Sequence, residues 1–176
     1  SLRNTLAPAL LALLLAGGAS PAQAGNQQYE PLAASVQAAL HTAVADQAPL
    51  DASFQRSPER ARWLAEMSQR LARRIPDETY RSELLRTVHY EATRAGLDPQ
   101  LVLGLIQVES GFKKYAVSSV GARGYMQVMP FWARLIGTED TNLFHMRTNL
   151  RFGCTILRHY LDIEKGDLFR ALGRYN

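Results

Sequence analysis

The stretch LVLGLIQVESGF, residues 101–112, is apolar for most of its length and then meets a carboxylate, Glu109. An Asp-Pro pair at 98–99 precedes it, and an acidic N-cap followed by proline is typical of a helix start. Leu105 and Ile106 lie four and three residues before Glu109, so all three share one face of the expected helix. The sequence therefore predicts an apolar helix face that ends in a carboxyl group.

Two physical effects act on Glu109 in such a helix. Partial desolvation and the negative end of the helix dipole both disfavour the charged form, so both should raise the pKa of its carboxyl group. A carboxylic acid that stays protonated near neutral pH can serve as a general acid. The segment taken alone also fits a glutamate turned to the surface at a fraying helix end, and both readings stay open at this point.

Helix signals recur along the chain, and no long alternation of β-branched or aromatic residues predicts a strand. The segment 111–130 interrupts these signals with several glycines and ends in a proline, so we expect it to be irregular. The predicted fold class is all-α. Helices are expected at 32–45, 58–75, 78–96, 99–110, 130–137, 149–166 and from 167 onward.

The first 24 residues have the composition of an export signal. An apolar run at 6–16 is followed by small residues and an A-x-A pattern at 22–24, which predicts cleavage before Gly25. The run is shorter than the roughly 20 residues of a membrane span, and no cysteine follows it that could carry a lipid. We expect a signal peptide at 1–24, no stable membrane anchor, and a location in the bacterial periplasm or outside the cell. A buried core helix is the alternative.

Composition narrows the classes of partner. The chain has 176 residues, is 47% hydrophobic and carries a net charge of +4. Arginines and acids are interleaved through 56–100, which is typical of an ion-paired helix surface rather than of a nucleic-acid stripe, so no nucleic-acid partner is expected. The single cysteine, Cys154, sits among apolar residues and is predicted to be a buried thiol. Histidine and cysteine spacings predict no metal site.

The irregular segment holds features of a ligand cleft. Gly121 and Gly124 would let the backbone turn tightly and approach a ligand closely. Gln127 lies between bulky apolar residues that include Met129. Apolar walls suit the faces of a sugar ring, and an amide suits an N-acetyl or hydroxyl group. A methionine-rich plug of the core is the competing reading.

Four motifs, in this order, resemble the soluble lytic transglycosylase domain, a family with the lysozyme-like fold of goose-type lysozymes. They are ESGF at 109–112, AVSSVGARGYMQVMP at 116–130, NLRFGCTILRHYL at 149–161 and ALGRYN at 171–176. The resemblance covers roughly residues 85–176. It suggests an N-terminal helical or linker extension at 25–75 and a catalytic domain at 76–176. We expect that domain to be truncated, because the family continues for some tens of residues beyond its last motif.

The resemblance also implies roles for single residues. Glu109 matches the family's sole catalytic acid. Positions that line the sugar cleft match Ser118, Gly124, Gln127 and Met129, and the tyrosine that faces the catalytic glutamate matches Tyr175. Tyr125 stands where the family often has leucine, which we read as a conservative change at the cleft wall.

The activity implied by this family is cleavage of the β-1,4 bond between N-acetylmuramic acid and N-acetylglucosamine in peptidoglycan, with formation of a 1,6-anhydro end. The glycan strands would be the partner, and no cofactor is needed. No Asp or Glu occurs between Glu109 and Glu139, which fits a reaction with one carboxylate, whereas ordinary glycosidases use two. A hydrolytic muramidase and a non-catalytic peptidoglycan-binding module are the alternatives.

Overall fold

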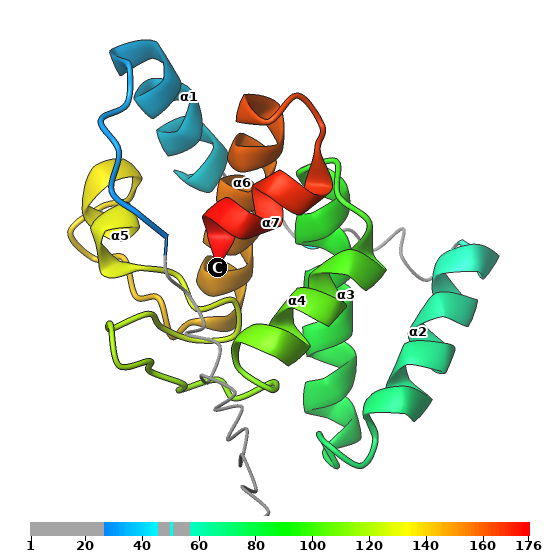
Figure 1. Cartoon of the computed structure of the whole chain (residues 1–176). Helices are drawn as coiled ribbons and strands as arrows, with labels where there is room; N and C mark the ends of the chain where they lie inside the picture. The colour runs from blue at the N-terminus through cyan, green and yellow to red at the C-terminus, as the bar shows by residue number, and fades with distance from the viewer. Residues whose placement is uncertain (1–26, 46–49, 51–56) are drawn as a thin grey trace, which may run out of the picture.

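The computed structural model describes residues 27–45, 50 and 57–176, which form seven helices (Figure 1). In chain order these are α1 (Ala34–Ala45), α2 (Pro58–Leu71), α3 (Glu78–Arg94), α4 (Pro99–Glu109), α5 (Pro130–Ile136), α6 (Met146–Ile163) and α7 (Leu168–Tyr175). Among the described residues the only sheet-like pairings are isolated bridges within the loop between α4 and α5. The all-α prediction and the irregular segment are therefore confirmed. The predicted signal peptide, 1–24, lies outside the described residues.

Four helices begin where a side chain caps the first turn. The capping oxygens accept hydrogen bonds from backbone N–H groups two or three residues ahead, which would otherwise lack a helical partner. The caps are Ser57 for α2, Asp77 for α3, Asp98 for α4 and Asp167 for α7. The helix starts predicted at residues 58, 78 and 99 are confirmed.

Helix α2 ends earlier than predicted, at Leu71 rather than at Ile75. Pro76 disfavours the helical conformation at the residue before it. The buried guanidinium of Arg81 then takes up the free carbonyls, with Nη1 2.6 Å from the Ile75 oxygen and 3.1 Å from the Pro76 oxygen. These two hydrogen bonds fix the turn between α2 and α3.

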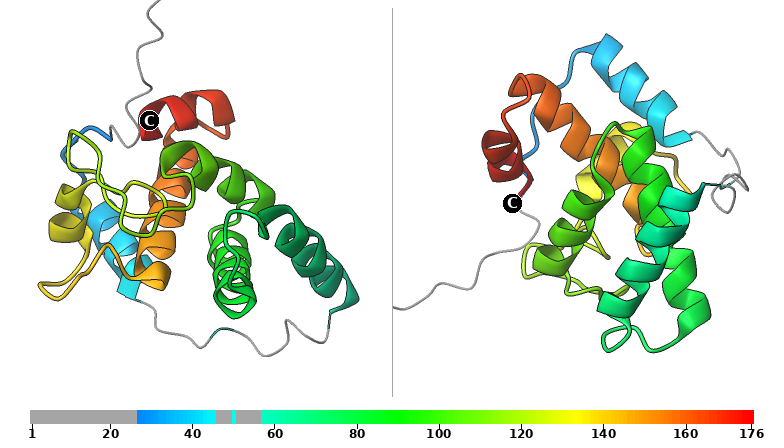
Figure 2. Two further views of the ribbon diagram at one scale, coloured as in Figure 1. Left: turned by 90° about the horizontal axis from the view of Figure 1, so that it is seen from below. Right: turned by 90° about the vertical axis from the view of Figure 1, so that its right-hand side faces the viewer.

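Helix α6 runs through the centre of the fold, with α3, α7 and α1 packed against it (Figures 1 and 2). Leu150, Ile156 and Leu157 are fully buried along it. Cys154 is also buried on this helix, as predicted, and burial raises the pKa of its thiol. The helix starts at Met146, three residues before the predicted start at 149.

A buried ion-pair cluster joins α3 to α6. The Glu91 carboxylate receives both Nη2 and Nε of Arg151, at 2.9 and 3.2 Å, and Nε of Arg147 at 3.3 Å. Arg94 lies 3.8 Å away. Because Glu91 is 1% exposed, this paired geometry compensates for its lost hydration. The cluster commits Glu91 to holding the fold together.

The N-terminal helices contact the predicted catalytic domain. Helix α1 packs on α5 and α6, and α2 packs on α3 (Figure 2). The boundary between an extension at 25–75 and a domain at 76–176 stays a prediction. Within the described residues, no helix is long and apolar enough to cross a membrane.

Candidate active site

Glu109 closes the buried face of α4. Leu105 and Ile106 are buried on that face, as their spacing predicts, and Glu109 itself is 5% exposed. Ser110 and the residues after it then turn the chain sharply, since Gly111 and Phe112 both have positive φ, at 57° and 65°. A carboxyl group at the end of an apolar helix is therefore directed into the fold instead of fraying into solvent.

Ser110 joins the end of α4 to the following loop. Its hydroxyl donates to the Tyr125 carbonyl oxygen at 2.7 Å, and the Ile106 carbonyl lies at 3.2 Å as a second acceptor. The Tyr125 side chain, nearly fully buried, makes a short hydrogen bond with the hydroxyl of Tyr80 on α3. These contacts place the middle of the loop beside Glu109's helix.

Asn149 of α6 anchors the same loop from the other side. Its Oδ1 accepts from the Met126 N–H at 2.8 Å, and its Nδ2 donates to the carbonyls of Arg123 at 2.8 Å and Leu143 at 2.7 Å. Gly124 is required by this contact, because a Cβ there would lie 2.4 Å from the Asn149 nitrogen, and its φ is 75°. The predicted need for glycine at 124 arises here from packing against α6.

The two polar side chains predicted to line the cleft shape the loop itself. Gln127 is buried with φ of 49°, and its Nε2 donates to the carbonyls of Ala116 and Gly124, both at 3.1 Å. Ser118 Oγ accepts from the Ala122 N–H at 3.1 Å and closes a turn. Both side chains therefore hold the loop backbone in place.

Tyr175, near the end of α7, brings the last motif to the site. Its side chain is fully buried, and its hydroxyl donates to the Met126 carbonyl at 2.7 Å. Burial raises the pKa of the Tyr175 phenol well above its usual range, and the nearby negative charge of Glu109 adds to the shift. Tyr175 is thus a neutral donor close to Glu109, and its proton is directed to the loop backbone.

Residues 86–176 match the family described as Transglycosylase SLT domain. The chain belongs to this family. It is also 38% identical over 90 residues to the transglycosylase of Enterobacteria phage PRD1. This match covers 51% of this chain and 33% of the phage protein. It is 48% identical over 48 residues to the membrane-bound lytic murein transglycosylase C of Actinobacillus pleuropneumoniae serotype 5b, and 45% identical over 49 residues to that of Haemophilus influenzae.

The SLT chain spans only part of these relatives. The match to transglycosylase C covers 27% of this chain and 13% of the Actinobacillus protein, and 28% and 14% for the Haemophilus protein. With the phage enzyme, the chain spans a third or less of the length of the curated relatives it matches.

Two residues that contact the 111–129 loop were not predicted as site residues from the sequence. For Asn149 the sequence predicts only a helix, although its spacing with Gly153, Ile156 and Tyr160 places it on the buried side. Gln27 lies in an Ala/Gln-rich segment with no local signal. Its carboxamide is buried against the loop and the end of α7. Its loop partner, Met129, lies more than 100 residues later in the sequence.

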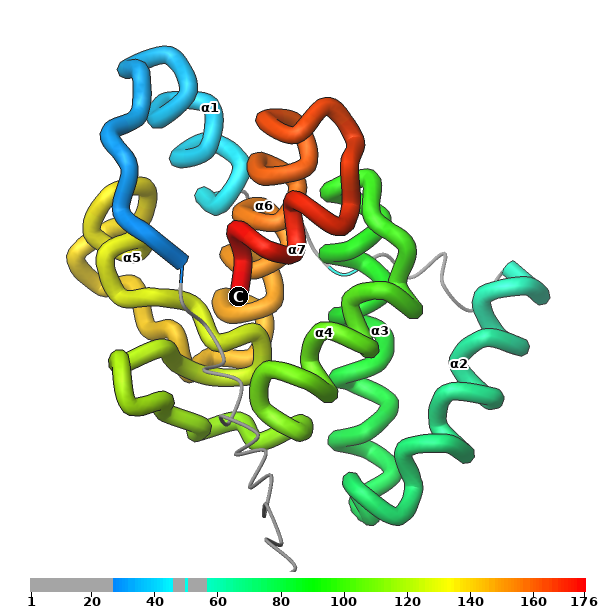
Figure 3. The backbone as a smooth tube through the Cα atoms, in the orientation of Figure 1, coloured from blue at the N-terminus to red at the C-terminus, as the bar shows by residue number. Residues whose placement is uncertain are grey.

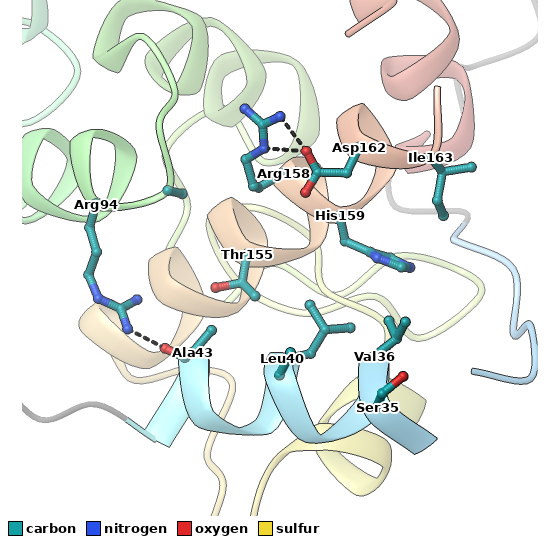
Figure 4. A pocket seen from close by; sticks show the side chains of 12 residues that line it. Ser35, Val36, Leu40, Ala43, Arg94, Thr155, Arg158, His159, Asp162 and Ile163 are labelled. Carbon is teal, nitrogen blue, oxygen red and sulfur yellow. Dashed lines mark hydrogen bonds and ion pairs between the residues drawn. The ribbon is translucent and has the colours of Figure 1, made fainter. Parts of the chain in front are cut away.

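A separate cavity of about 850 Å³ lies between α1 and α6 (Figure 4). Its lining includes Val36, Leu40 and Ile163 and none of the predicted site residues. The charged groups at its rim are paired, since Arg158 Nε contacts Asp162 at 2.9 Å. This cavity therefore does not contribute to the site around Glu109.

Proposed function

We propose that this SLT domain is a peptidoglycan lytic transglycosylase that cleaves the β-1,4 bond between N-acetylmuramic acid and N-acetylglucosamine and leaves 1,6-anhydro ends. The observation that carries the proposal is the buried Glu109 carboxyl group, which lies at the end of α4 and close to Tyr175 of α7. A carboxyl group shielded from water can exchange a proton with a bound sugar, because few water molecules are near enough to exchange that proton instead.

In the proposed reaction Glu109 first donates its proton to the glycosidic oxygen. The bond from the anomeric carbon to that oxygen breaks, and its electron pair leaves with the N-acetylglucosamine oxygen. The acetamido oxygen of the muramic acid stabilises the anomeric centre. Glu109, now a carboxylate, takes the proton of the 6-hydroxyl, and the 6-oxygen bonds to the anomeric carbon. This closes the anhydro ring and returns Glu109 to its acid form without consuming water.

A single glutamate suffices in this scheme, so no second carboxylate needs to face it. Glu91 is the other deeply buried carboxylate among the described residues, and its bidentate pairing with Arg151 makes it unsuited to proton transfer. This division of roles supports the one-carboxylate reaction over a mechanism with two flanking acids.

The remaining predicted residues would line the sugar cleft. Met129 is half-buried at the start of α5 and offers a thioether surface to a ring face. Gly124 permits close packing of the loop, while Ser118 and Gln127 keep the cleft wall in shape. Tyr175 fixes the Met126 carbonyl and keeps a neutral hydroxyl near Glu109. The substrate lies outside the cytoplasm, so we propose export by the N-terminal signal peptide to the periplasm or exterior.

The test is digestion of purified peptidoglycan followed by mass spectrometry of the products. Wild-type protein should release anhydromuropeptides, and Glu109→Gln, which keeps the shape of the side chain but cannot donate a carboxyl proton, should release none. Products one water heavier would identify a hydrolase instead. Binding to peptidoglycan with no products from either protein would identify a binding module.

A further inference from the structure

Residues 27–33, which lead into α1, lie next to the C-terminal end of α7. Figure 3 shows this segment running beside α5 toward the C-terminal end of α7. The Tyr29 ring packs edge-on against Phe131, with centroids 5.7 Å apart, and Glu30 pairs with Arg174 at 3.2 Å. We call residues 27–31 the N-terminal strap.

Gln27 of the strap makes three hydrogen bonds with one buried carboxamide. Its Oε1 accepts from the Met129 N–H at 2.9 Å. Its Nε2 donates to the carbonyl oxygens of Gln127 at 3.1 Å and Tyr175 at 2.8 Å. The side chain is 3% exposed, and its three partners are main-chain groups of residues proposed to line the sugar cleft.

This pattern of donors and acceptors is the one that an acetamido group requires. The acetamide of an N-acetylated sugar has one carbonyl acceptor and one N–H donor. The glutamine carboxamide has the same carbonyl acceptor and two N–H donors. It could therefore accept from the Met129 N–H and donate to one of the two carbonyls. A buried carboxamide of the chain and an acetamido group of the substrate would compete for the same main-chain groups.

Given the proposed function, on which this inference rests, we propose that the N-terminal strap is an intramolecular pseudosubstrate, with the Gln27 carboxamide occupying the position of a substrate acetamido group. In this state the Gln27 carboxamide occupies the Met129 N–H and the carbonyls of Gln127 and Tyr175. A glycan strand must displace Gln27 to bind, so the state with the strap seated is the resting state of the enzyme.

The size of the effect follows from the population of the open state. If the strap is seated in about nine molecules of ten, the apparent affinity for an acetylated glycan falls about tenfold. Removing the carboxamide should recover that factor in KM and leave kcat unchanged, because the strap would be absent from the productive complex.

The competing reading is that Gln27 is a positioning residue, which clamps the loop to α7 in the working enzyme. The two readings predict effects of opposite sign. A pseudosubstrate raises the apparent KM, so its loss improves binding; a clamp supports the site, so its loss weakens binding or lowers kcat.

The experiment compares the full chain with Gln27→Ala and with Gln28→Ala as a matched control. Gln28 is an adjacent, exposed glutamine of the same strap. Affinity for tri-N-acetylchitotriose is measured by calorimetry, and kcat and KM are measured on soluble, uncrosslinked glycan strands. We expect about tenfold tighter binding and a lower KM for Gln27→Ala, with Gln28→Ala matching wild type.

Weaker binding or a lower kcat for Gln27→Ala, with a folded protein and active wild type, would overturn the pseudosubstrate and leave the proposed function intact. Tighter binding by Gln27→Ala with no turnover by any protein would support the strap's role and overturn the proposed function. Equal affinities for all three proteins would overturn the inference.

A measurement on wild type keeps the inference testable if the variant fails to fold. The side-chain NH₂ resonances of Gln27 are followed by NMR during titration with the acetylated trimer, and with a glucosamine trimer that lacks acetamido groups. Only the acetylated trimer should move them to the positions of a solvent-exposed glutamine. If they stay in place while that trimer binds, the strap does not compete with it.

Discussion

Replacing Asn149 with alanine is expected to lower the free energy of unfolding by about 3–5 kcal/mol, because it removes three hydrogen bonds from a fully buried site. The Asn149 carboxamide joins α6 to Arg123, Met126 and Leu143 at 2.7–2.8 Å. The variant leaves the buried Met126 N–H and the buried Leu143 carbonyl without that partner, at about 1–3 kcal/mol each before relaxation, while the Arg123 carbonyl still accepts from the Val128 N–H. A domain of this size is stable by only about 5–15 kcal/mol, so the loss is large.

The assay is urea unfolding followed by far-UV circular dichroism, with Asn142→Ala as the matched control. Asn142 is exposed, and its Oδ1 accepts one hydrogen bond, from the Phe144 N–H at 2.9 Å. Its loss should cost less than about 1 kcal/mol. Amide exchange at Met126 should speed up in Asn149→Ala and stay unchanged in the control.

An Asn149→Ala protein within about 1 kcal/mol of wild type, with an unchanged m value, would refute the reasoning. Such a result would mean that water replaces the carboxamide at little cost, and that the loop keeps its shape without α6. An unchanged exchange rate at Met126 would refute the same point independently.

Three further outcomes are expected. Gly124→Ala should lose about 2–4 kcal/mol of stability and most of its turnover, because φ at this position is 75° and the added Cβ would lie 2.4 Å from the buried amide nitrogen of Asn149. Gly121→Ala is the control: φ is 89° there, but the space around it is open, so thermal unfolding should show a loss of about 1 kcal/mol. Glu91→Gln should lose about 3–5 kcal/mol in urea unfolding, because its buried arginine partner is left without a counter-charge. Stability should also fall as the pH drops below about 6.5, because burial lowers the pKa of His89 and His159 and the unfolded state then binds more protons than the folded one. Urea unfolding at about pH 7.5 and 5.5 should show a smaller difference for the His89→Gln/His159→Gln double variant than for wild type.

The parts of the fold that were predicted from the sequence depend on short-range chemistry. A serine or aspartate at a helix start forms its capping bond with a residue two or three places away, so Ser57 and Asp98 could be read locally. The side of α4 on which Glu109 lies follows from helical geometry over about one turn. Predictions of this kind need no knowledge of what the element packs against.

The parts that were missed depend on contacts far apart in the sequence. Gln27 and Gln28 sit in the same local pattern, yet only Gln27 is buried, because its partners are at the far end of the chain. Tyr125 was read as an apolar replacement at the cleft wall, and the structure shows its hydroxyl bonded to Tyr80 of α3. No periodicity reports such pairs, since the fold must first bring the segments together.

In the proposed site, polar side chains and main-chain groups would have different roles in recognition. The side chains of Gln127 and Ser118 form hydrogen bonds within the loop. The groups that meet a carboxamide are main-chain groups, namely the Met129 N–H and the carbonyls of Gln127 and Tyr175. A main-chain group keeps its chemistry whatever side chain it carries, so substitutions around the loop can change only where these groups lie. Recognition of an acetamide here would thus depend on placement, which Asn149 and Gly124 control, and any carboxamide that reaches the same place can compete for it.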